Sequence, residues 1–232
     1  PGVKGAGLLQ AGLQGLAQQG VAVTLFTDVV ADPPVHVIDA AVKLAVDAKV
    51  DGVISIGGGS SMDVAKLVAL LAVGQEKLDD IYGVGMVKGR RLPLVLAPTT
   101  AGTGSEVTPI SIVTTGEGEK KGVVSPVLLP DWAVLDAELT LGLPPAVTAA
   151  TGIDAMVHAI EAYASASPNN NPISRQLAVT ALQKMAPVLE RAVHDGKTDT
   201  AARADMMLGS MWAGQAFANS PVAAVHALAY PL

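Results

Sequence analysis

The chain has 232 residues, half of them hydrophobic and 3% aromatic, and its 15 Lys+Arg and 21 Asp+Glu give a formal net charge of −6. This apolar fraction is enough for a buried core, and a charged fraction of 16% is too low for a disordered chain. The acidic balance argues against nucleic acid and anionic membranes as partners. The best apolar run, residues 67–73, is far shorter than the ~20 residues of a membrane-spanning helix.

Cysteine is absent from the sequence, which excludes a disulfide scaffold, a thiolate metal site and a cysteine nucleophile. This composition is compatible with a reducing cytoplasm, where we expect the protein to act. The chain begins at Pro1 without a basic-then-apolar leader, and it ends at Leu232 directly after an apolar, alanine-rich stretch. We therefore expect a longer protein that is truncated here at both ends.

Strand-like and helix-like segments alternate in the first half of the chain. Apolar, β-branched runs predict buried strands over residues 21–26, 51–56 and 92–97. Apolar residues at helical spacing predict helices over residues 8–19, 35–50 and 62–73, the first ending at Gly20. This alternation indicates a parallel sheet covered by helices on both faces, which is an α/β architecture.

The composition changes near residues 139–145, and no strand is predicted beyond Pro144. Alanine-rich segments with helical spacing cover residues 145–165, 172–194 and 200–229, separated by Pro, Asn and Gly. The predicted fold class is an α/β N-terminal domain with a parallel sheet, followed by an all-helical domain, both incomplete. We place these domains at residues 1–140 and 141–232.

A glycine-rich loop, Gly57–Ser61, follows a predicted strand and opens a predicted helix. Its glycines let backbone N–H groups approach a phosphate closely, and the helix N-terminus adds favourable partial positive charge. The loop matches neither the GxGxxG nor the P-loop pattern. The alternative interpretation is a glycine-rich turn in which Ser60 or Ser61 caps the helix.

A second loop, Pro98–Glu106, also follows a predicted strand and places Thr99, Thr100, Thr103 and Ser105 among glycines. Hydroxyls and free backbone amides at the ends of strands suit a nucleotide site in an open α/β sheet. The alternative is a solvated loop, because Thr and Ser are common in turns. Adjacent parallel strands would bring both loops to one edge of the sheet, so together the loops favour nucleotide or phosphate binding.

The helical half contains a set of possible metal ligands. Asp154 and His158 are four residues apart on one predicted helix face, and Glu161 lies on the same face. His226 lies in an apolar segment, where an imidazole is costly to bury unless it is paired or bound to a metal. One carboxylate and two imidazoles suit Fe²⁺ or Zn²⁺. The alternative is a helical Asp–His ion pair, or a core histidine satisfied by Asp154.

Five segments, in this order, resemble the iron-containing alcohol dehydrogenases, which share a fold with dehydroquinate synthase and glycerol dehydrogenase. They are GGGSSMDVAK at 57–66, APTTAGTGSEVT at 97–108, LLPDWAVLDAELT at 128–140, TGIDAMVHAIEAY at 151–163 and HALAYPL at 226–232. The resemblance covers essentially the whole chain. It implies an N-terminal dinucleotide-binding domain, a C-terminal helical metal-binding domain, a nicotinamide cofactor (NAD or NADP) and one divalent iron or zinc ion.

The resemblance also implies roles for individual residues. Asp154, His158 and His226 match three of the family's four metal ligands, and the fourth, a histidine, would follow Leu232. Contacts with the cofactor are implied for Gly58, Gly59, Ser60 and Asp63, for Thr99, Thr100 and Thr103, and for Lys120 or, with a slipped loop, Lys121. Tyr230 stands where some members carry a histidine in the substrate cleft.

The function that the resemblance implies is hydride transfer between an alcohol or aldehyde and NAD or NADP, with the metal polarising the substrate oxygen. We expect a small alcohol or aldehyde as substrate and a homodimer as the assembly. Other functions stay open: a glycerol dehydrogenase, a maleylacetate reductase, a dehydroquinate synthase-type cyclase, or a non-catalytic truncated fragment. The presence of both Asp154 and His158 argues against the metal-independent maleylacetate reductase.

Overall fold

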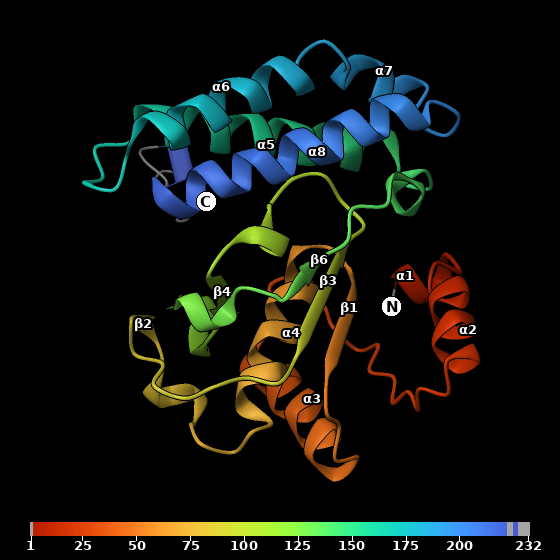
Figure 1. Ribbon diagram of the computed structural model, residues 1–232, viewed down its shortest axis with the longest axis vertical. Helices are drawn as coiled ribbons and strands as arrows, with labels where there is room; N and C mark the ends of the chain where they lie inside the picture. Colours follow the sequence, from red (N-terminus) through yellow and green to blue (C-terminus); the bar gives the residue numbers. More distant parts are fainter. Residues whose placement is uncertain (1, 222–224, 227–232) are drawn as a thin grey trace. The chain divides into compact units, whose positions relative to one another are not determined.

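The computed structural model describes residues 2–221, 225 and 226 of the chain. The chain divides into two compact units (Figure 1). The α/β unit comprises Pro1–Ala97 and Pro109–Val134, and the helical unit comprises Pro98–Thr108 and Leu135–Leu232. The short segment Pro98–Thr108 therefore belongs with the helices, although strands of the α/β unit precede and follow it in sequence.

The α/β unit contains two small sheets. Its strands are β1 (Val53–Gly57), β2 (Gly83–Val84), β3 (Leu94–Pro98), β4 (Ile110–Thr114), β5 (Lys120–Val124) and β6 (Trp132–Ala133). One sheet has the order β1-β3-β6, with β6 parallel to β3 and Val95 opposite Trp132. The other has the order β2-β5-β4, in which β5 runs parallel to β2 and antiparallel to β4. The predicted α/β fold is confirmed, and the antiparallel pair is a feature that the sequence analysis missed.

Helices accompany these strands in the predicted order. They are α1 (Gly2–Gly5), α2 (Gln10–Gln18), α3 (Val35–Asp47) and α4 (Gly59–Leu71), with short 3₁₀ helices η1 (Leu78–Asp80), η3 (Gly116–Gly118) and η4 (Pro126–Leu128). The predicted helices over residues 8–19, 35–50 and 62–73 are confirmed as α2, α3 and α4, and the predicted strands over 51–56 and 92–97 as β1 and β3.

The predicted strand over residues 21–26 is wrong, because this segment has no regular structure. No strand in the described part of the chain pairs with it, so its backbone lacks the ladder of hydrogen bonds that defines a strand. The exposure of its side chains also differs from that of a buried strand. Val21, Val23 and Leu25 are almost half exposed, and Phe26 packs against the core.

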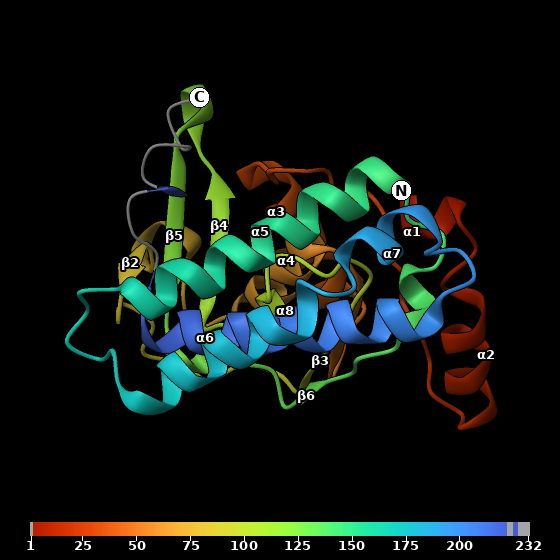
Figure 2. The same ribbon diagram turned by 90° about the horizontal axis from the view of Figure 1, so that it is seen from above.

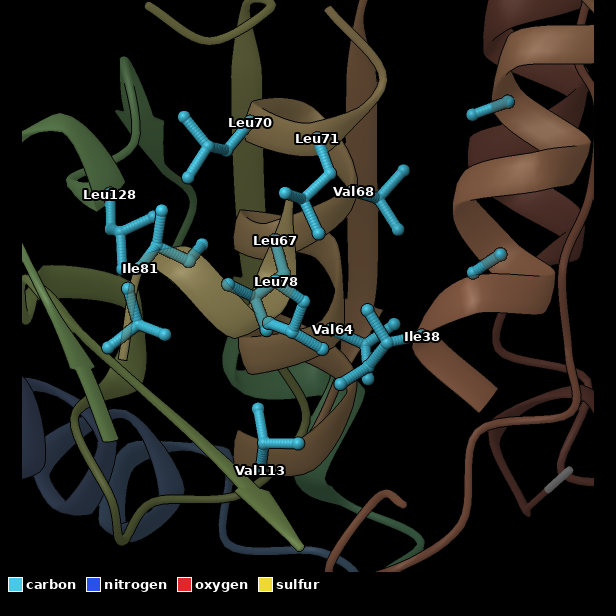
Figure 3. Close-up of a cluster of buried hydrophobic side chains, with 13 residues drawn as sticks. Ile38, Val64, Leu67, Val68, Leu70, Leu71, Leu78, Ile81, Val113 and Leu128 are labelled. Atoms are coloured by element: carbon cyan, nitrogen blue, oxygen red, sulfur yellow. The ribbon is translucent and has the colours of Figure 1, made fainter. Parts of the chain in front are cut away.

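Helix α4 is the centre of the core of the α/β unit. On one face, Val64, Leu67 and Leu71 belong to a buried cluster with Ile38 of α3 and Leu78 of η1 (Figure 3). The other face packs on the first sheet, where Met62, Ala65 and Ala69 meet Leu94 and Leu96 of β3. Burial of each large aliphatic side chain contributes roughly 1.5–3 kcal/mol. Packing on both faces therefore fixes α4 and the glycine loop that precedes it.

Polar contacts connect α4 to β4. An oxygen of the Asp63 carboxylate accepts the backbone N–H of Ile112 at 3.0 Å, and the Asp63 carbonyl accepts the hydroxyl of Ser111 at 3.0 Å. The fully buried ammonium of Lys66 donates to the carbonyl of Ile110 at 2.7 Å and lies 3.6 Å from Asp63. A buried ammonium requires such partners because its desolvation is costly. These contacts hold the start of α4 against β4.

The helical unit is built from α5 (Pro145–Ala164), α6 (Pro172–Met185), α7 (Leu189–His194) and α8 (Thr200–Asn219), with the 3₁₀ helices η2 (Ser105–Val107) and η5 (Ala137–Thr140). Helices α5, α6 and α8 lie side by side (Figures 1 and 2) over a cluster rich in alanine and methionine. Small side chains allow the helix backbones to approach closely. None of the described helices has the length and apolar character needed to cross a membrane.

The helices of this unit follow the sequence prediction with two differences. The predicted helix over residues 172–194 divides into α6 and α7, because Pro187 cannot occupy a helix interior without clashing with the preceding turn. The predicted helix over residues 200–229 ends at Asn219 as α8, and residues 222–224 and 227–229 lie outside the described residues. The predicted absence of strands beyond Pro144 is confirmed for residues 144–221.

Arg203 of α8 is a buried charge that connects three parts of the helical unit. Its guanidinium donates to Thr148 Oγ1 at 2.7 Å, to the Gly196 carbonyl at 3.1 Å and to the Leu143 carbonyl at 3.3 Å. Burial lowers the pKa of Arg203. We expect Arg203→Ala to lower the free energy of unfolding by about 3 kcal/mol, because three acceptors lose their donor and a cavity remains.

Urea denaturation followed by circular dichroism measures this effect. Arg175→Ala serves as the control, because Arg175 lies exposed on α6. Equal loss of stability in the two variants would contradict the structural role of Arg203.

Candidate metal centre and cofactor loops

Helix α5 places three polar side chains along one face. The helix begins at Pro145, a position where the fixed φ of proline suits the first turn, and it is rich in alanine, which favours helix. Asp154, His158 and Glu161 follow one another at intervals of four and three residues, which brings them above one another on this face. His158 and Glu161 are buried, and Asp154 is partly exposed.

His226 joins this face from a segment more than sixty residues further along the chain. Its Nε2 lies 3.7 Å from an oxygen of Asp154, and its ring stacks on that of His158 with the centroids 4.5 Å apart. Nδ1 of His158 lies 3.8 Å from the other oxygen of Asp154. One donor atom of each residue lies within 4.8 Å of the other two. The structure thus brings together the three residues predicted as metal ligands.

Asp154 lies within ion-pair distance of His158, as one alternative interpretation expects, but it forms no hydrogen bond that would satisfy the ring, as the other would require. Nδ1 of His158 is buried without a hydrogen-bond partner among the described residues, and 3.8 Å is too long for a hydrogen bond to Asp154. The ring also interacts with the backbone of Gly102 and packs against Phe217, with centroids 5.1 Å apart. Burial lowers the pKa of His158, although the carboxylate of Asp154 opposes the shift. The neutral imidazole, which is the form that binds metals, is therefore favoured.

Glu161 contacts the segment that carries His226. One carboxylate oxygen accepts the backbone N–H of Val225 at 2.6 Å, and the other lies 2.5 Å from Nδ1 of His226. The helical spacing of the sequence predicts Glu161 on the face of Asp154 and His158 but indicates no role for it. Helical spacing is the one signal in the sequence that points to Glu161. Its contact with His226 could not be predicted, because the two residues lie far apart in sequence.

Asp154, His158 and His226 fit a divalent iron or zinc ion. A carboxylate and two imidazoles are donors of intermediate softness, which these ions accept. A buried imidazole nitrogen without a hydrogen bond is costly, and a metal ion would satisfy it. A histidine whose second ring nitrogen contacts a carboxylate, as in His226, has an arrangement typical of metal ligands.

The predicted phosphate loop forms the turn from β1 into α4. The helix begins at Gly59 with Gly58 as its N-cap, and no side chain caps it, so the alternative interpretation of Ser60 or Ser61 as the cap is wrong. A Cβ added to Gly57 would lie only 2.5 Å from Cβ of Ser61, so this tight turn requires glycine. Backbone N–H groups at a helix start without a side-chain cap are the groups that bind phosphate in other proteins.

Two residues predicted to contact the cofactor have protein partners in the structure. Asp63 bonds to β4 and faces Lys66, as described above. Lys120 of β5 lies 2.8 Å from Asp32, and both side chains are well exposed. Their contacts with a cofactor stay predictions. Tyr230 lies outside the described residues.

The glycines of the second loop serve close packing within the helical unit. Gly104 has a φ of +61°, and a Cβ there would lie 2.6 Å from Cα of Gly214 in α8. A Cβ at Gly102 would lie 2.9 Å from Cβ of Thr151 in α5. Both positions therefore need glycine, for a reason that the sequence did not reveal.

The threonines of this loop differ in exposure. Thr99 is buried, Thr100 is half-buried and Thr103 is exposed, so the interpretation as a fully solvated loop is wrong. The hydroxyl of Thr103 accepts the backbone N–H of Ser105 at 3.2 Å. Contact of these threonines with a nucleotide stays a prediction.

The chain matches two models of one protein family. Residues 1–137 match a family model described as iron-containing alcohol dehydrogenase, and residues 148–232 match the C-terminal model of the same family. The chain belongs to the iron-containing alcohol dehydrogenase family.

Individual relatives show the extent of the similarity. Long-chain-alcohol dehydrogenase 1 of Geobacillus thermodenitrificans is 49% identical over 220 residues, which cover 94% of this chain and 55% of the relative. The structure of an alcohol dehydrogenase from Oenococcus oeni matches with a TM-score of 0.92 at 33% identity, covering 97% of this chain and 58% of that one.

A sulfoacetaldehyde reductase from Bifidobacterium kashiwanohense, solved in complex with NAD⁺, has a TM-score of 0.89 at 34% identity, with 98% of this chain and 60% of that one covered. The chain thus spans 55–60% of the length of these proteins. Over that part, the dehydroquinate synthase-like fold expected from the resemblance is confirmed.

Proposed function

We propose that the protein is a metal-dependent alcohol dehydrogenase that transfers a hydride between an alcohol or aldehyde and NAD or NADP. The proposal rests on the cluster of Asp154, His158 and His226, whose donor atoms lie within 4.8 Å of one another and include a buried nitrogen without a hydrogen bond. Family membership supports it, as do the activities named for the relatives and the NAD⁺ bound to one of them.

In this proposal, Asp154, His158 and His226 hold Fe²⁺ or Zn²⁺. Bound there, the ion would supply a Lewis acid for the oxygen of the substrate, while the nicotinamide supplies the redox chemistry. The contribution of the chain is to present neutral imidazoles, which the lowered pKa of His158 favours, and to exclude water around them by packing Phe217 against the ring.

The cofactor residues are proposed from the resemblance and their positions. Gly58, Gly59 and Ser60 lie at the N-terminus of α4, where the helix dipole and backbone N–H groups suit the pyrophosphate. We further propose that residues within 1–140 bind the dinucleotide and residues within 141–232 bind the metal. Thr99, Thr100, Thr103, Asp63 and Lys120 complete the proposed set of cofactor contacts.

For the whole protein we propose a small alcohol or aldehyde as substrate, a homodimer as the assembly and a cytoplasmic location. The relatives act on chemically different compounds, among them long-chain alcohols and sulfoacetaldehyde, by their names. The substrate therefore depends on contacts beyond the metal ligands that the family shares.

The test is to combine metal analysis with a nicotinamide assay on the complete protein. We expect about one tightly held Fe²⁺ or Zn²⁺ per chain after dialysis, and production of NADH or NADPH from short-chain alcohols. Reductase activity without metal would instead indicate a maleylacetate reductase. Metal without nicotinamide turnover would indicate a cyclase, and preference for glycerol a glycerol dehydrogenase.

The glycine loop gives a separate prediction. We expect Gly59→Val to weaken NADH binding by at least about tenfold, because a branched side chain at the first residue of α4 blocks the approach of the pyrophosphate to the backbone. NADH fluorescence titration measures the affinity. Gly116→Val serves as the control, since a Cβ at Gly116 has no neighbour within 4 Å. Unchanged affinity in Gly59→Val would remove this loop from the cofactor site.

A further inference from the structure

Glu161 contacts the chain segment of His226 through both oxygens of its carboxylate. The residue lies in α5, three positions after His158, and only 4% of its surface is exposed. One oxygen accepts the backbone N–H of Val225 at 2.6 Å, and the other lies 2.5 Å from Nδ1 of His226. A buried carboxylate thus holds both the backbone and the side chain of this segment.

The contact has a consequence for the two nitrogens of the His226 ring. An ionised carboxylate only accepts hydrogen bonds, so Nδ1 must carry a proton to bond to it. In the neutral ring Nε2 then carries the lone pair, and Nε2 is the atom that lies 3.7 Å from Asp154. The carboxylate of Glu161 therefore selects the tautomer in which the unprotonated nitrogen, Nε2, faces Asp154.

We propose that Glu161 is a positioning residue of the metal centre, which fixes the tautomer and the direction of the His226 ring without itself binding the ion. This inference rests on the proposed function, since it concerns the same cluster. The geometry separates Glu161 from the ligands: the donor atoms that approach one another belong to Asp154, His158 and His226. A purely structural ion pair between Glu161 and His226 would stabilise the fold but would not change the affinity for a metal. Positioning of the His226 ring by Glu161 would change that affinity.

The experiment compares Glu161→Gln and Glu161→Ala with the unchanged protein as a full chain. Gln keeps one acceptor oxygen but presents an NH2 donor in place of the second oxygen, so it can preserve only one of the two contacts, whereas Ala removes both. The control is Glu190→Gln on α7, where the side chain is exposed and belongs to no described cluster of metal-binding side chains. Zn²⁺ affinity is measured by competition with a chromophoric chelator, and thermal melting reports on the fold.

We expect Glu161→Ala to weaken Zn²⁺ binding by about 10- to 100-fold, the usual cost of removing an outer-shell partner. Glu161→Gln should recover part of this affinity, and Glu190→Gln should bind as the unchanged protein does. In the metal-free protein, nitrogen-15 NMR should show His226 protonated on Nδ1. Glu161→Ala should lose the preference for that tautomer.

Two results would overturn the inference: Zn²⁺ affinity of a folded Glu161→Ala variant within twofold of the unchanged protein, or a neutral His226 protonated on Nε2 in the unchanged protein. The tautomer measurement needs no bound metal, so it also separates this inference from the proposed function. If the unchanged protein bound no Zn²⁺ or Fe²⁺, the proposed function would fail. The Nδ1 tautomer, present in the unchanged protein and lost in Glu161→Ala, would still support positioning of His226 by Glu161.

Discussion

Replacing His158 by Ala in the complete protein should remove most of the bound metal and nearly all turnover. The substitution deletes one of the three donors that cluster among the described residues. Metal content by plasma emission after dialysis and NADH or NADPH production from an alcohol measure the two losses. We expect both to fall by at least about tenfold, since loss of a ligand costs no less than loss of an outer-shell partner.

His194→Ala is the matched control for this prediction. His194 ends α7, is exposed, and belongs to no described cluster of metal-binding side chains. The variant should keep the metal content and the turnover of the unchanged protein. Equal behaviour of the two histidine variants would leave the assignment of His158 without support.

The second large effect is expected at the contact between the second loop and α8. Gly104→Val should destabilise the helical unit by about 3 kcal/mol or more, because the backbone has a positive φ and the added Cβ would lie 2.6 Å from Cα of Gly214. Backbone atoms on both sides of this contact cannot move aside as the end of a flexible side chain does. Thermal melting followed by circular dichroism measures the loss.

Gly142→Ala is the control for this contact, because a Cβ at Gly142 has no neighbour within 4 Å. The melting temperature of this variant should be close to that of the unchanged protein. If Gly104→Val had the same melting temperature as Gly142→Ala, the loop would not pack on α8 as described.

Features set by local spacing could be predicted from the sequence. The helical periodicity around Asp154 and His158 predicted both α5 and the shared face of the two side chains, and alternating segments predicted β1, α4 and β3. The end of α6 was also available locally, since Pro187 marks it, but the prediction extended the helix across this residue.

Features that depend on distant partners could not be predicted in this way. Residues 21–26 have the composition of a strand, yet strand formation needs a neighbour, which the described chain does not provide. The antiparallel partner of β5, the packing of Gly104 on Gly214, and the contact of Glu161 with His226 each join residues far apart in sequence. Single-residue patterns carry no information about such pairs.

The packing of Pro98–Thr108 has a consequence for protein engineering. Surface loops usually accept insertions and substitutions, and a loop rich in Thr and Gly would be an obvious place to alter cofactor preference. Here Gly102 and Gly104 are seated against α5 and α8, and the backbone at Gly102 interacts with His158. In a library that varies the length of this loop, we therefore expect most variants to be inactive, because a change of length would disturb His158, a candidate metal ligand. Randomising only the outward side chain of Thr103, at constant length, keeps that contact intact.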